Sequence, residues 1–209
     1  MLPAKKKIAV LVSGSGTNLQ AIISAINNGR LNHADIAVVI SNKKDAFALE
    51  RAKKSGIESL FLNPKDFTSN IDYDKKLIEV ISNYKADLIV LAGYTKILTD
   101  AFINVFPNKI INIHPALLPN FGGVGMYGKK VHEAVLKSGV QESGCTVHFV
   151  TKEVDSGPII AQKKVPVLPN DTIDSLSSRV LQEEHKLLIE SIKKIFTGSN
   201  IACHTSTGL

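Results

Sequence analysis

The sequence predicts an α/β protein with a doubly wound, mostly parallel sheet and antiparallel strands added in the C-terminal third. Two observations lead to this fold class. Short apolar runs of strand length alternate with amphipathic helical patterns, so that a strand–helix–strand unit recurs four times. The last third instead places two strand-like runs in succession with only a turn between them.

The first half of the chain supplies five expected strands. Residues 8–12 form a continuous β-branched-rich run, typical of a strand buried on both faces. Residues 18–28 carry apolar side chains at helical spacing, and Gly29 stands where a helix stop is expected. The same patterns predict further strands over 36–40, 59–62, 87–92 and 109–113, and further helices over 46–55 and 73–84.

The second half changes character after the glycine- and proline-rich loop 117–127. We expect a helix over 131–136, strands over 145–150 and 159–167, and a long last helix over 173–196. No clear linker interrupts the chain. The expectation is a single domain over 1–197, with an N-terminal half over 7–110 and a C-terminal half over 111–197, followed by a flexible tail over 198–209.

Composition excludes several classes of protein. The 209 residues are 44% hydrophobic and 21% charged, which is ordinary for a globular protein and excludes disorder of the whole chain. Two cysteines cannot make a disulfide scaffold. The longest apolar stretch, 86–95, contains Asp87 and is about half of a membrane span. We therefore expect a cytoplasmic protein that does not bind membranes.

The net charge of +6 comes from lysines that are spread along the chain. Aromatic residues make up 6% and tryptophan is absent, so the sequence lacks the basic face with aromatics that is typical of a nucleic-acid binder. A pocket for small anionic molecules explains the modest basicity equally well. We expect small-molecule partners and no nucleic acid.

The loop Ser13-Gly14-Ser15-Gly16-Thr17-Asn18 joins the first strand to the first helix. Its two glycines allow a tight turn, Thr17 or Asn18 can cap the helix, and the helix N-terminus favours an anion. The full dinucleotide fingerprint and the P-loop pattern are both missing. A phosphate site and a plain tight turn both remain open on this loop alone.

Two further loops carry ionisable groups. Alternation along the fifth strand places Asn112 and His114 on one face, before Pro115. There the imidazole can exchange protons and the amide can donate to an oxyanion. Asp155 lies in a turn near Gly157, where it is either simple turn chemistry or a carboxylate that raises the pKa of a histidine.

The remaining histidines and cysteines are weaker candidates. His148 shares a strand face with Thr146 and Val150, so it can line a site. The apolar strand around Cys145 favours a buried side chain rather than a nucleophile. No Cys/His spacing is typical of a metal site, so no metal is predicted.

Taken together, the loops resemble one family, the phosphoribosylglycinamide formyltransferases of purine biosynthesis. The matching stretches are IAVLVSGSGTNLQAII near the start, LAGYTKIL at 91–98, NIHPALLPNFGG at 112–123, GCTVHFVTKEVDSGPIIAQ at 144–162 and LQEEH at 181–185. The resemblance runs from about residue 7 to residue 196. It implies a Rossmann-like formyltransferase fold.

The resemblance also implies a reaction and a site. 10-Formyltetrahydrofolate, a co-substrate, would give its formyl group to the amine of glycinamide ribonucleotide (GAR), with Asn112, His114 and Asp155 as the catalytic residues. Gly16, Thr17 and Asn18 would hold the GAR phosphate and Glu184 its ribose. The folate would lie against Asn70, Leu91, Thr95, Lys96, Ile97, Leu98, Asn112, Thr151, Lys152, Glu153, Val154 and Asp155.

Lys96 stands where the family often has arginine, so it keeps the charge without the planar guanidinium, and Asn70 stands near where some members place an arginine that meets the folate tail. The alternatives are a formyltetrahydrofolate hydrolase, which would carry a regulatory domain before the first strand, and a non-catalytic ligand-binding domain of the same fold. Some relatives dimerise, so both a monomer and a homodimer remain open.

Overall fold

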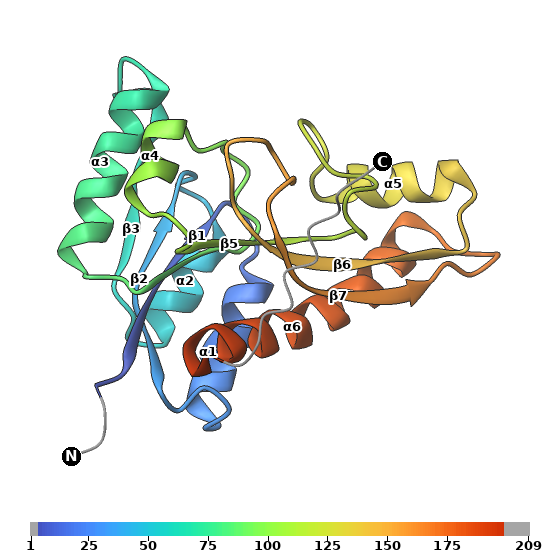
Figure 1. Cartoon of the computed structure of the whole chain (residues 1–209), viewed down its shortest axis with the longest axis horizontal. Helices are drawn as coiled ribbons and strands as arrows, with labels where there is room; N and C mark the ends of the chain where they lie inside the picture. Colours follow the sequence, from blue (N-terminus) through green and yellow to red (C-terminus); the bar gives the residue numbers. More distant parts are fainter. Residues whose placement is uncertain (1–3, 199–209) are drawn as a thin grey trace. The chain divides into compact units, whose positions relative to one another are not determined.

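The computed structural model describes residues 4–198 and divides the chain into two compact units, one up to Ile111 and one from Asn112 (Figure 1). The predicted tail over 199–209 lies outside the described residues, as do Cys203 and His204.

The first unit alternates strands and helices as the sequence predicts. Its elements are β1 (Lys6–Val12), α1 (Thr17–Asn27), β2 (Ala34–Ser41), α2 (Phe47–Lys54), β3 (Ser59–Phe61), the 3-10 helix η1 (Pro64–Asp66), α3 (Asn70–Asn83), β4 (Leu88–Leu91), α4 (Asp100–Val105) and the start of β5 (Ile110–His114). Parallel pairing joins β1 to β2 and β4, and β2 to β3. Within this unit the strand order is β3-β2-β1-β4.

This order reverses direction at β1, since the chain moves outward through β2 and β3 and returns to the other side of β1 for β4. With right-handed crossovers, the reversal places α1 and α2 on one face of the sheet and α3 on the other. The carboxyl ends of β1 and β4 therefore form a switch point, which is where open α/β sheets bind ligands.

Two elements differ from the sequence prediction. Helix α3 begins at Asn70 rather than at 73, because the Ser69 side chain caps it by accepting from the Asp72 N–H. Helix α4 was not predicted; its six residues are too few to display a helical period. Figure 1 shows α4 beside α3.

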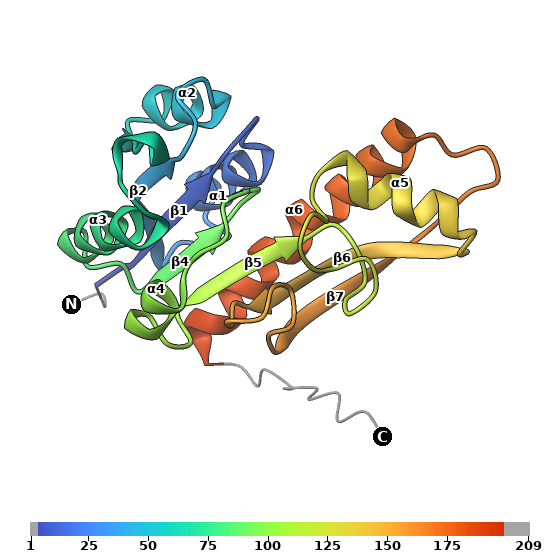
Figure 2. The same cartoon turned by 90° about the horizontal axis from the view of Figure 1, so that it is seen from above.

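The second unit begins with the last residues of β5 and continues through α5 (Lys129–Ser138), β6 (Glu142–Phe149), β7 (Ile159–Pro166) and α6 (Ile173–Thr197). The pair β6 and β7 is antiparallel, with an irregularity between Val147 and His148. Helix α6 runs along both strands (Figure 2). It starts with a capping box between Thr172 and Ser175.

The strand order β3-β2-β1-β4-β5-β6-β7 confirms the predicted mostly parallel sheet with antiparallel strands in the C-terminal third. Strand β4 is entirely buried and lies between β1 and β5, as its apolar sequence suggested. Between residues 4 and 198, no helix is both long and apolar enough to cross a membrane.

Candidate active site

The end of β5 presents the first two candidate residues. Asn112 is half-buried and His114 is 3% exposed. The Nε2 atom of His114 lies 2.8 Å from the carbonyl oxygen of Phe121, so this nitrogen carries a hydrogen and donates. The opposite ring nitrogen, Nδ1, therefore faces away from the loop contact and toward the third candidate.

Asp155 is that third residue, and the turn before β7 brings it to His114. Its Oδ2 atom lies 3.5 Å from His114 Nδ1 and accepts from the Gly123 N–H at 3.0 Å. Its Oδ1 atom lies 3.4 Å from Asn112 Nδ2. Asp155 has a φ of 55°, in the left-handed region that Asp and Asn enter more readily than most residues. The structure thus brings Asn112, His114 and Asp155 together within the second unit.

His148 is a fourth member, which the sequence ranked below the others. Its Nδ1 atom lies 2.9 Å from the Phe149 carbonyl oxygen and donates to it. Its Nε2 atom is then the acceptor for Asn112 Nδ2 at 3.2 Å, and lies 3.5 Å from Asp155 Oδ1. One amide N–H of Asn112 is thereby directed at His148 and the other at Asp155.

The loop after β5 is tied down by Thr146 on β6. The Thr146 hydroxyl donates to the Ala116 carbonyl at 2.6 Å and accepts from the Leu118 N–H and from Gln162 Nε2. These bonds hold the segment between His114 and Phe121 against β6. The local alternation placed Thr146 on the face of His148, but no sequence signal indicated its three partners.

Burial sets the direction of the pKa shift of His114 but not that of Asp155. Desolvation lowers the pKa of His114 below its ordinary 6.5, although the Asp155 carboxylate and the Phe121 carbonyl act in the opposite direction. Burial alone would raise the pKa of Asp155, but the contact with His148, the attraction of His114 and the hydrogen bond from the Gly123 N–H lower it overall. Asp155 favours the imidazolium as expected, but it does not outweigh the burial of His114.

The glycine-rich loop after β1 lies in the first unit. Gly16, with a φ of 71°, is the residue that caps α1, and no side chain caps it; the expectation that Thr17 or Asn18 is the cap is wrong. A Cβ at Gly16 would lie 2.6 Å from Ala48 Cβ, so only glycine fits this turn. Arg51, which the sequence did not single out, donates from Nε to the Ser15 carbonyl at 2.8 Å.

The other expected ligand contacts are divided between the units. In the first unit, Lys96 Nζ donates to Asn70 Oδ1 and lies 5.0 Å from the centre of the Tyr73 ring. Thr95 donates its N–H to the Ser13 hydroxyl at 2.9 Å, Leu91 and Leu98 are buried, and Ile97 is exposed.

In the second unit, the loop residues Thr151, Lys152, Glu153 and Val154 precede Asp155, and the Thr151 hydroxyl donates to the Glu153 carbonyl at 3.3 Å. Glu184 on α6 is buried. Burial, followed by the charge of Glu184, raises the pKa of Cys145 to about 12, which does not favour a nucleophilic thiolate.

The chain matches a known protein family and is similar to individual proteins of that family. Residues 6–192 match the model of the formyl transferase family. The phosphoribosylglycinamide formyltransferase of Haemophilus influenzae is 46% identical over 87% of this chain and 83% of that protein. The chloroplastic enzyme of Arabidopsis thaliana is 45% identical over 92% of this chain, which spans 66% of that protein.

Among solved structures, glycinamide ribonucleotide transformylase 1 from Symbiobacterium toebii superposes with a TM-score of 0.88. It is 44% identical, and the match covers 93% of this chain and 89% of that one. Residues 6–192, which match the family model, contain both the loop after β1 and the cluster at the end of β5.

Proposed function

The chain belongs to the formyl transferase family, and on that premise we propose that it transfers a formyl group to the amine of GAR in purine biosynthesis. The formyl donor is 10-formyltetrahydrofolate. The observation that carries this proposal is the contact of Asn112, His114 and Asp155 in a chain whose relatives bear that enzyme's name.

The reaction needs one proton moved and one negative charge stabilised. The GAR amine attacks the formyl carbon, a carbon–nitrogen bond forms, and the formyl oxygen becomes an oxyanion. The bond to N10 of the folate then breaks. The amine loses a proton and N10 gains one, so the products are N-formyl-GAR and tetrahydrofolate with no net change in protons.

His114 suits both halves of this exchange. Because burial lowers its pKa, it is neutral before the reaction, with its hydrogen on Nε2 and a lone pair on Nδ1. Nδ1 takes the proton of the attacking amine, and the resulting imidazolium stabilises the oxyanion. Asp155 stabilises the imidazolium, and Nδ1 finally returns the proton to N10.

Asn112 supplies the second donor to the oxyanion. Its amide N–H toward Asp155 has the longer contact, 3.4 Å, against 3.2 Å toward His148. We propose that the Asn112 N–H on the longer contact donates to the oxyanion, while the other N–H stays hydrogen-bonded to His148. Removing one donor of this kind costs roughly 2.7–4 kcal/mol of transition-state stabilisation.

The residues that bind the two substrates are proposed on the same family membership. Gly16, Thr17 and Asn18 hold the GAR phosphate, since a helix N-terminus with an open cap suits a phosphate. Glu184 accepts from the ribose hydroxyls. The folate contacts are Asn70, Leu91, Thr95, Lys96, Ile97 and Leu98 in one unit, and Asn112 with 151–155 in the other. We further propose a cytoplasmic monomer or homodimer with small molecules as its partners.

The direct test is a spectroscopic assay of tetrahydrofolate formation from 10-formyltetrahydrofolate, run with and without GAR. The proposal predicts folate product only when GAR is present, and N-formyl-GAR by mass. Equal product without GAR would identify a hydrolase. A folded protein that gives no product under either condition would favour a ligand-binding domain.

A further inference from the structure

An open pocket of about 490 Å³ lies in the first unit at the carboxyl ends of three neighbouring strands. Ser13 follows β1, residues 42–46 follow β2, and Phe61 ends β3. Asn63 and Lys65 complete the lining. Figure 1 shows α2 beside β2 and β3, and Ala46, the N-cap residue of α2, is one of the lining residues. The volume is within the range of small-molecule sites, about 300–1,000 Å³.

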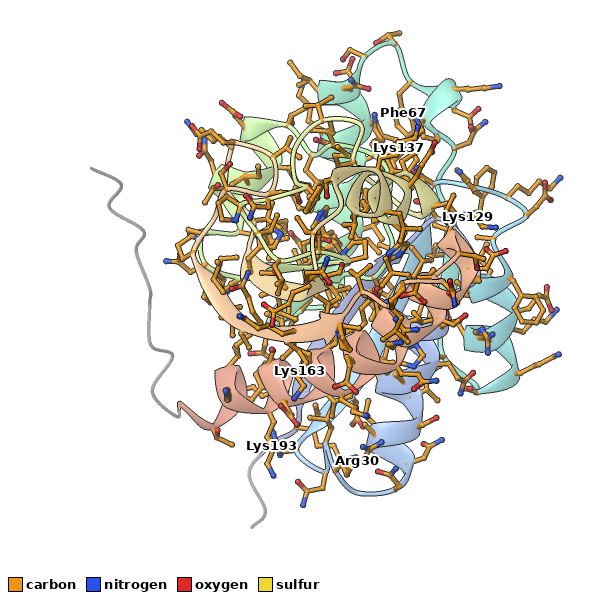
Figure 3. The ribbon with its side chains drawn as sticks, turned by 90° about the vertical axis from the view of Figure 1, so that its right-hand side faces the viewer. Arg30, Phe67, Lys129, Lys137, Lys163 and Lys193 are labelled. Carbon is orange, nitrogen blue, oxygen red and sulfur yellow. The ribbon has the colours of Figure 1, made fainter. Side chains whose placement is uncertain are left out.

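The lining of the pocket carries a net positive charge. The lining contains three lysines, Lys43, Lys44 and Lys65, and one carboxylate, that of Asp45. In the described part of the chain none of these lysines forms a salt bridge, whereas Lys129 and Lys137, both labelled in Figure 3, pair with Asp174 and Glu133. Unpaired cations around one hollow repel one another and attract an anion.

Two uncharged residues of the lining indicate which chemical groups the ligand carries besides a negative charge. Phe61 lines the pocket and is 40% exposed, so its ring offers a surface on which a flat ring can stack. Asn42 accepts from the Ser13 hydroxyl through Oδ1 at 2.6 Å, so its Nδ2 is the end that can donate to a ligand. The Ala46 cap of α2 uses no side-chain hydrogen bond.

The pocket is distinct from the residues assigned to GAR. Gly16, Thr17 and Asn18 are not among its lining residues. Ser13 is the member of the glycine-rich loop that reaches it, and its hydroxyl is already bonded to Asn42 and to the Thr95 N–H. A ligand here would therefore leave the proposed GAR phosphate site open.

We propose that this pocket binds a mononucleotide, with the phosphate held by Lys43, Lys44 and Lys65 and the base stacked on Phe61. The Asn42 amide donates to the base or to the sugar. This inference goes beyond the proposed transfer reaction, and it assigns the first unit a second anion site.

The experiment is calorimetric titration of the full chain with AMP, adenosine and ribose 5-phosphate. AMP is expected to bind at least about tenfold more tightly than either adenosine or ribose 5-phosphate. Its affinity should fall at high salt, because the lysines are exposed. Lys43→Ala/Lys65→Ala and Phe61→Ala should each weaken AMP binding by about tenfold. The matched control is Lys53→Ala/Lys54→Ala, which removes two exposed charges outside the lining and should leave AMP binding unchanged.

Titration of GAR into the AMP complex separates this proposal from the proposed function. GAR should bind without displacing AMP, and turnover of GAR should stay within about twofold in Phe61→Ala. Displacement of AMP by GAR, or AMP binding that survives both pocket variants, would overturn the proposal. The proposed transfer of the formyl group to GAR would be unaffected by either result, because it depends on residues outside this pocket.

Discussion

At the scale of single residues, burial and hydrogen-bond direction define the site more than charge does. The bond from His114 Nε2 to Phe121 fixes the tautomer, and Asp155 then lies beside Nδ1. The spacing of Asn112 and His114 was legible in the sequence because strand alternation is regular. The contacts of His148 with Asn112 and Asp155 were not legible in the sequence, because they form in the folded structure and Asn112 lies 36 positions away along the chain.

Asp155→Asn tests the carboxylate without disturbing the backbone. Asparagine also tolerates the φ of 55° at this position, so the turn should keep its shape. Turnover should fall by roughly 10²–10³ because the imidazolium of His114 loses its stabilising charge. Steady-state kinetics and a thermal melt on the same preparation measure both points, and a variant with near-normal turnover would refute the role given to Asp155.

At the scale of elements, the strands and long helices were predictable because their apolar periods are strong. The segments that connect these strands and helices were less predictable. The 3-10 helix η1 and helix α4 are too short to show a period, and the approach of Arg51 to Ser15 joins residues 36 positions apart. The loops that carry the chemistry are held by such long-range bonds.

The loop after β1 offers a matched pair of glycine variants. Gly16→Ala combines a strained φ of 71° with a Cβ 2.6 Å from Ala48 Cβ, whereas a Cβ at Gly14 meets no atom within 4 Å. Gly16→Ala should raise KM for GAR by at least about tenfold with little change in kcat, which is the signature of lost binding that is equal in the ground state and the transition state. Gly14→Ala should leave both constants within about twofold; equal effects of the two variants would contradict the assignment of the phosphate site.

The Thr146 hydroxyl provides a test of how β6 supports the loop after β5. Thr146→Val keeps the shape of the side chain but leaves the Ala116 carbonyl and the Leu118 N–H without their partner. The free energy of unfolding should fall by about 1–3 kcal/mol, and turnover should fall with it. Urea unfolding measures the first quantity. Thr146→Ser, which keeps the hydroxyl, should lose much less, and a similar loss in both variants would disprove the hydrogen-bond explanation.

At the scale of the whole molecule, buried histidines make stability depend on pH. Burial lowers the pKa of His114, His132 and His185 below 6.5. The unfolded chain therefore takes up protons first, so stability is retained above about pH 6.5 and lost as the pH falls through the lowered values. The lowered pKa of Asp155 adds a further loss below about 3.8.

Urea unfolding at pH 8, 6.5 and 5.5 should therefore give a falling free energy, by up to about 1.4 kcal/mol per pH unit for each histidine that titrates. His132→Gln should reduce the slope below pH 6.5, since Nδ1 of His132 is buried and, within residues 4–198, has no hydrogen-bond partner. A free energy of unfolding that stays constant from pH 8 to pH 5.5 would contradict the lowered pKa of these histidines.

The most direct test of the central claim follows the formyl carbon itself. 10-Formyltetrahydrofolate labelled with ¹³C in the formyl group is incubated with GAR and the protein, and carbon NMR identifies where the label goes. The proposed mechanism predicts that the label moves to the GAR nitrogen, and that His114→Ala slows this transfer by roughly 10²–10³. Label recovered as formate, or equally fast transfer by the variant, would contradict it.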